Sequence, residues 1–95
     1  MAQGALVGDM GSGHDGYPAT AIISGSPTVK IDGKSVARQG DALVPHDKPK
    51  HPTHARQIKQ GASSVMIDGM PAARVGDAIS CGGVIIGGSS VNIGK

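Results

Sequence analysis

The chain has 95 residues and a formal charge of +2, with 16 glycines, 6 prolines, one tyrosine and neither phenylalanine nor tryptophan. This length predicts a single domain over residues 1–95, whose small core of Val, Ile and Ala needs additional stabilisation, for which a bound metal is the first candidate. The mild charge does not indicate a nucleic-acid partner, and no segment approaches the roughly 20 apolar residues of a membrane helix.

The N-terminal segment, residues 1–7, has neither the basic region nor the apolar stretch of a secretory signal peptide. We therefore expect the protein to be made in the cytoplasm, and its single cysteine, Cys81, to stay reduced and form no intramolecular disulfide. The high glycine and proline content and the lack of an apolar stripe with a period of 3.6 residues predict no helix.

A repeated unit dominates the sequence. Residues 22–41 align with residues 58–77 at an offset of 36, with ten of the twenty positions identical. In each copy a V-x-I strand with alternating burial runs into Asp-Gly, which is typical of a tight two-residue turn with positive φ. Each copy therefore predicts a β-hairpin, with the return strands at residues 35–39 and 71–75.

A third, incomplete copy starts at Val84 and ends at Lys95 before any return strand. The missing end has its counterpart at the N-terminus, since the V-G-D run at residues 7–9 matches the V-G-D run at residues 75–77. We infer that the N-terminal strand completes the third hairpin. The prediction is an all-β fold of three hairpin repeats with pseudo-threefold symmetry, closed on itself so that few sheet edges stay open.

Metal-ligating side chains follow the end of each repeat. His14 and His46 each lie five residues after the closing Asp, and Cys81 lies four residues after it. A fourth ligand comes from His51 or His54, between which the repeat spacing does not decide. Three imidazoles and one thiolate suit a tetrahedral Zn²⁺, and four protein ligands predict a closed, structural site with one zinc ion per chain.

Two further sets of charged residues allow two interpretations each. The basic side chains of the segment 46–59 could form a phosphate-binding patch or a solvated loop around a metal ligand, and the loop is favoured: Lys48, Lys50, Arg56 and Lys59. Arg38 and Arg74 recur at matched positions with Asp41 and Asp77, either as a binding motif or as structural ion pairs, and the ion pairs are favoured.

The motifs of the second repeat resemble a known family. Residues 71–74 read Pro-Ala-Ala-Arg, the tetrapeptide that names the PAAR-repeat proteins, and the S-P-T-V run at residues 26–29 and Cys81-Gly82-Gly83 are also similar to that family. The first repeat departs from the pattern, with Ser-Val-Ala-Arg at residues 35–38. The resemblance covers essentially the whole chain.

The resemblance implies a small conical β-structure with zinc near its vertex, held by three histidines and one cysteine. It implies His46 and His54 as ligands eight residues apart, which completes the set His14, His46, His54 and Cys81. It also implies a monomer that caps the β-prism end of the trimeric VgrG spike of the type VI secretion system, sharpens it for envelope puncture and leaves the cell with it, with effector proteins as further partners.

Other functions compete with this one. The tip of a contractile phage tail spike would share every feature described above. A free-standing zinc-dependent hydrolytic domain would need an open coordination position for water, which four protein ligands do not leave. A small nucleic-acid binder would need stacking aromatic side chains, and the chain has a single tyrosine. We therefore predict a structural protein that is not an enzyme.

Overall fold

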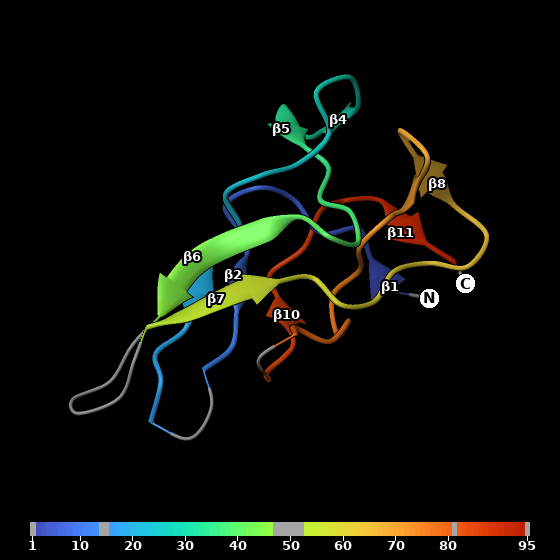
Figure 1. Cartoon of the computed structure of the whole chain (residues 1–95). Coiled ribbons are helices and arrows are strands. Elements are labelled where there is room, and N and C mark those ends of the chain that lie inside the picture. The colour runs from blue at the N-terminus through green and yellow to red at the C-terminus, as the bar shows by residue number, and fades with distance from the viewer. Residues whose placement is uncertain (1, 14–15, 47–52, 81, 95) are drawn as a thin grey trace.

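The computed structural model describes residues 2–13, 16–46, 53–80 and 82–94 and forms an elongated β-structure of 40 × 23 × 22 Å (Figure 1). Every helix or strand in these ranges is a β-strand, which confirms the all-β prediction. No helix in this part of the chain is long and apolar enough to cross a membrane. In chain order the strands are β1 (Ala2–Gln3), β2 (Met10–Gly11), β3 (Thr20–Ala21), β4 (Lys30–Ile31), β5 (Lys34–Ser35), β6 (Ala42–His46), β7 (His54–Gln57), β8 (Met66–Ile67), β9 (Met70–Pro71), β10 (Ile85–Ile86) and β11 (Asn92–Ile93).

One half of the molecule is a closed circuit of paired strands. Strand β10 pairs with β2, β2 with β3, and β6 with β7, all antiparallel. Further bridges join β3 to β6, β7 to the segment that follows Asp77, and that segment back to β10: Ile22↔Leu43, Ile58↔Ile79 and Ala78↔Val84. Because the circuit closes, it has no free edge along which another strand could add.

Next to this circuit lies a ring of three alanines, one from each matching segment. The Ala37 amide donates to the Ala5 carbonyl, the Ala73 amide to the Ala37 carbonyl, and the Ala5 amide to the Ala73 carbonyl, each at 2.9 Å. All three residues are fully buried. The ring brings three backbone segments so close together that only a small side chain fits at these positions.

The hairpins project from the other side of this ring. Strands β4–β5 and β8–β9 are each closed by an Asp-Gly turn in which both residues have positive φ, 53° and 77° for Asp32 and Gly33 and 53° and 81° for Asp68 and Gly69. Strand β1 pairs with β11 through Ala2↔Ile93 and Gln3↔Asn92. The predicted Asp-Gly turns and the predicted pairing of the two chain ends are therefore confirmed.

The return strands are shorter than predicted. Val36 and Ala72 still donate to their own hairpins, to the carbonyls of Val29 and Val65. The same two residues also form bridges to a neighbouring segment, Val36 to Leu6 and Ala72 to Arg38. Gly4 pairs with Arg74 in the same way. Each segment changes partner because its hairpin is only two residue pairs long, whereas the ring supplies backbone partners to all three segments.

The core is aliphatic throughout its described part. One cluster fills the closed circuit and the alanine ring: Ala5, Ile22, Ala37, Leu43, Ile58, Ala73, Ile79 and Ile85. A second cluster lies beneath the hairpins: Leu6, Val36, Ala62, Ile67, Ala72 and Ile93. Burial of these side chains contributes roughly 1.5–3 kcal/mol for each larger aliphatic residue relative to exposure, so the small core supports a narrow molecule.

Candidate functional site

His46 is the one predicted zinc ligand whose side chain falls within the described residues. It ends β6, is 2% exposed, and its ring stacks on Tyr17 with the centroids 4.8 Å apart. Its Nδ1 lies 2.9 Å from the carbonyl oxygen of Pro18. A carbonyl only accepts, so Nδ1 is the donor in this contact, and Nε2 is the ring nitrogen left to bind a metal. This geometry fits a metal-ligating histidine held by a backbone carbonyl.

Of the other predicted ligands, only His54 has a described backbone position. His54 pairs with His46 across the β6–β7 hairpin, beyond a register shift, although its side chain is outside the described part. His14, Cys81 and the alternative His51 also lie outside the described residues. Among the residues that are described, no three His, Cys, Asp or Glu side chains cluster to hold a metal. The four-ligand site therefore stays a prediction.

The segments that flank His14 and Cys81 in sequence are adjacent. The Ser12 amide donates to the Val84 carbonyl at 2.8 Å, and the Val84 amide donates to the Ser12 hydroxyl at 2.9 Å. Ser12 precedes His14 by two residues, and Val84 follows Cys81 by three. The described segments that flank these two predicted ligands in sequence are therefore neighbours in the fold.

Arg56 contradicts the expectation of a solvated basic loop. Its side chain is 1% exposed and donates to backbone carbonyls and a hydroxyl, so Arg56 belongs neither to a phosphate patch nor to a solvated face. Lys59, in contrast, is exposed, and Lys48 and Lys50 lie outside the described residues. A signal in the sequence could have revealed this, because Arg56 and the buried Ile58 share one side of an alternating strand.

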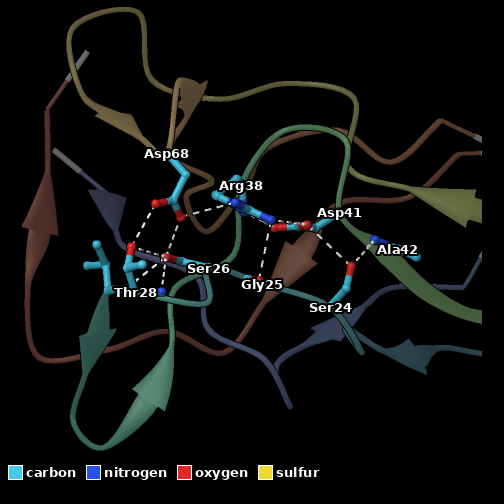
Figure 2. Close-up of polar contacts among 9 residues, drawn as sticks. Ser24, Gly25, Ser26, Thr28, Arg38, Asp41, Ala42 and Asp68 are labelled. Atoms are coloured by element: carbon cyan, nitrogen blue, oxygen red, sulfur yellow. Dashed lines mark hydrogen bonds and ion pairs between the residues drawn. The ribbon is translucent and has the colours of Figure 1, made fainter.

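Arg38 and Asp41 form a buried bidentate ion pair (Figure 2). Asp41 accepts from Arg38 Nε and Nη2, both at 3.0 Å, and from the Arg38 amide at 2.8 Å. Arg74 and Asp77 repeat all three bonds, at 3.1, 2.8 and 2.8 Å. This confirms that the repeated Arg and Asp residues are structural ion pairs, each of which closes the turn at the end of its repeat.

Asp68 connects its hairpin turn to the preceding repeat. Its carboxylate accepts from the hydroxyls of Ser26 and Thr28 at 2.5 and 2.6 Å and from Arg38 Nη1 at 3.1 Å (Figure 2). Asp32 makes a related link, since it accepts from the Ser90 hydroxyl at 2.7 Å and the Ser90 amide at 2.8 Å. These bonds fix the hairpins relative to one another.

The hydrogen bonds to Asp68 and Asp32 make the free energy of unfolding depend on pH in the acid range. The Ser26 and Thr28 hydroxyls, with a smaller contribution from Arg38, lower the pKa of Asp68, and the Ser90 hydroxyl and amide lower the pKa of Asp32. A lowered folded-state pKa stabilises the fold above the unfolded-state pKa of about 4. That contribution is lost as the pH falls from about 4 through the folded-state pKa.

We therefore expect Asp68→Asn to unfold with a shallower loss of stability below about pH 4 than the wild type, because one of the shifted carboxylates is gone. Urea unfolding of both proteins at a series of pH values from 7 to 2.5 measures the difference. Lys59→Gln, which alters an exposed charge elsewhere, is the control. Identical pH profiles for the wild type and Asp68→Asn would contradict the assignment.

These features define a class of protein, a small elongated β-structure of short hairpins in which an Arg–Asp ion pair closes the turn at the end of each of two repeats. The sequence matches the PAAR motif family over residues 12–87, most of the chain, and the protein belongs to that family. Membership relates it to the spike-tip proteins of the type VI secretion system. A search of curated proteins finds none that matches significantly.

Proposed function

We propose that this protein is a non-enzymatic cap for the β-prism end of a trimeric VgrG-type spike. The observation that supports the proposal is the closed cycle of hydrogen bonds among the three alanine segments, in which each segment makes the same contact to the next. The same cycle is repeated by the bridges Leu6↔Val36, Arg38↔Ala72 and Gly4↔Arg74. Because the chain has three matching segments, each segment could contact one of the three identical subunits of a trimer in a similar way.

The docking surface we propose is the end that carries the hairpins. Figure 1 places β4–β5, β8 and β11 at the end of the molecule away from His46, where β6 stops. Apolar side chains are exposed on this end: Met66 by 60%, Val91 by 44% and Val29 by 36%. Val29 and Val91 hold the same position in their repeats, so the exposed apolar side chain is shared by two of the three repeats.

At the opposite end we propose one structural zinc ion held by His14, His46, His54 and Cys81. Bound zinc would supply a rigid tetrahedral cross-link between the connections of the three repeats. The proposal is supported by the orientation of the His46 ring, which the contact from Nδ1 to Pro18 and the stack on Tyr17 hold in place. Such a cross-link would stiffen the part of the tip that first meets an envelope.

In this function the protein would be assembled in the cytoplasm, leave the cell on the spike, and bring separately encoded effectors as further cargo. The test is binding of the purified protein to the isolated trimeric β-prism end of the VgrG spike from the same genome. We expect one chain per trimer, measured by light scattering and calorimetry. Absence of binding would contradict the proposal.

The side chain that should matter most is Met66. We expect Met66→Asp to weaken binding to the trimer at least about tenfold, because it places a charge in an apolar contact. The matched control is Val44→Asp, which charges a 41% exposed apolar residue on β6, toward the other end. Equal weakening by both variants would show that the hairpin end is not the docking surface.

A further inference from the structure

Arg56 is a fully buried cation in the narrow half of the molecule. It projects inward from β7, is 1% exposed, and is the largest of the fully buried side chains. Neither the predicted metal site nor the docking surface includes it. The burial of its guanidinium is therefore not explained by either proposed site.

The guanidinium joins three separate parts of the chain. Nη1 donates to the carbonyl of Gly11 at 3.1 Å and to the hydroxyl of Thr20 at 3.0 Å. Nη2 donates to the carbonyls of Ser12 at 2.5 Å and Gly82 at 3.2 Å. These acceptors lie on the β2–β3 hairpin and on the segment before β10, whereas Arg56 lies on β7. One planar group thus connects all three hairpins of the closed circuit from the inside.

Two glycines make room for this group. A Cβ on Gly11 would lie 3.3 Å from Arg56 Nη2 and 2.5 Å from Leu43 Cδ2. A Cβ on Gly83 would lie 3.2 Å from the same nitrogen and 2.4 Å from the Ser12 carbonyl oxygen. Glycine at both positions lets the backbone approach the guanidinium, so the space around Arg56 is shaped by neighbouring segments as well as by its own strand.

Among the described residues, no carboxylate pairs with Arg56. The acceptors of Arg56 are neutral oxygens, and its Nε has no acceptor among the described residues. A buried charge without a carboxylate partner is costly, and an apolar side chain of similar volume is often at least as stable. An apolar side chain could not hydrogen-bond to the four oxygens that the planar guanidinium of Arg56 contacts.

Two of the four acceptor residues, and Arg56 itself, lie within two residues of a predicted ligand in the sequence. Ser12 precedes His14 by two residues, Gly82 directly follows Cys81, and Arg56 follows His54 by two. We propose that Arg56 is a positioning residue that sets the backbone of the three ligand-bearing connections in the spacing zinc requires. The inference rests on the zinc site proposed above.

The test compares Arg56→Met and Arg56→Lys with a control in the other core cluster, Ile67→Ala. Zinc affinity is measured by competition with a chelator, and the ligand geometry by the visible absorption of the cobalt-substituted protein. We expect Arg56→Met to weaken zinc binding about 10–100-fold and to change the cobalt spectrum, as loss of a group that orients ligands does. Arg56→Lys, which keeps the charge without the planar fork, should fall between.

The control separates positioning from stability. Ile67→Ala should lower the unfolding midpoint through a cavity, while its zinc affinity and cobalt spectrum stay within about twofold of the wild type. Equal losses of affinity in Arg56→Met and Ile67→Ala would overturn the inference, and if Arg56→Met does not fold, Arg56→Lys decides by the same comparison. A wild-type chain that binds no zinc would overturn the proposed site and this inference with it.

Discussion

His46→Ala is expected to lower the free energy of unfolding in excess zinc by about 4 kcal/mol or more. A ligand present at about 1,000 times its dissociation constant stabilises the folded state by about 4 kcal/mol. The binding free energy of structural zinc sites is larger than this, roughly 10–16 kcal/mol. The substitution also removes the stack on Tyr17 and the hydrogen bond to Pro18. Metal analysis and thermal unfolding, with and without a strong chelator, measure both effects.

The alternative fourth ligand provides the control for this experiment. We expect His54→Ala to lose zinc and stability as His46→Ala does, and His51→Ala to keep about one zinc per chain and the wild-type midpoint. The reverse result would make His51 the ligand. A wild type that purifies without metal, or whose midpoint of unfolding does not change on chelation, would show that the predicted histidine and cysteine ligands do not form a site.

The second large effect is expected at Asp41. Asp41→Ala removes a carboxylate that accepts three bonds from Arg38, whose side chain is 11% exposed. Removing one partner of a buried ion pair costs about 3–5 kcal/mol, and we expect a loss at the lower end of this range because Arg38 keeps its pair with Asp68. Chemical denaturation at pH 7 measures the loss. Asp77→Ala removes the same bonds from Arg74, but that side chain is 25% exposed, so water compensates and a smaller loss is expected.

A double substitution shows whether the charge causes the loss. Arg38→Met with Asp41→Ala removes both charges, and we expect it to recover part of the stability that Asp41→Ala loses. The recovery should be incomplete, because Arg38 also donates to Asp68 and to the Gly25 carbonyl. A double variant less stable than Asp41→Ala would mean that Arg38 stabilises the fold mainly through those other contacts.

Local features of the fold were predictable because neighbouring residues determine them. An Asp-Gly pair after an alternating strand favours positive φ at both positions, and both turns have it. The spacing of Arg38 and Asp41 places a carboxylate where it reaches its own turn's amide and the guanidinium together, and the repeat at Arg74 and Asp77 indicated that this was structural. The pairing of β1 with β11 followed from the incomplete third repeat.

Contacts between repeats were not predictable in the same way. The return strands were expected to continue with their own partners as far as residues 39 and 75, but from Val36 and Ala72 onward they form bridges to other repeats, to Leu6 and Arg38. The link from Asp68 to Ser26 and Thr28 likewise joins two repeats across 42 and 40 residues. Periodicity shows which residues alternate in a strand, but it carries no information about which other strand they meet.

By itself the sequence determined the strand type of the elements, the Asp-Gly turns, the Arg–Asp pairs and the choice of candidate ligands, because each depends on residues close together in the chain or repeated along it. Only the tertiary structure decided that the alanine segments close into a hydrogen-bonded ring and that Arg56 is buried. The physical reason is the same for both. A buried backbone group or guanidinium is stable only where acceptors converge on it, and here these come from distant segments, up to 45 residues away from Arg56.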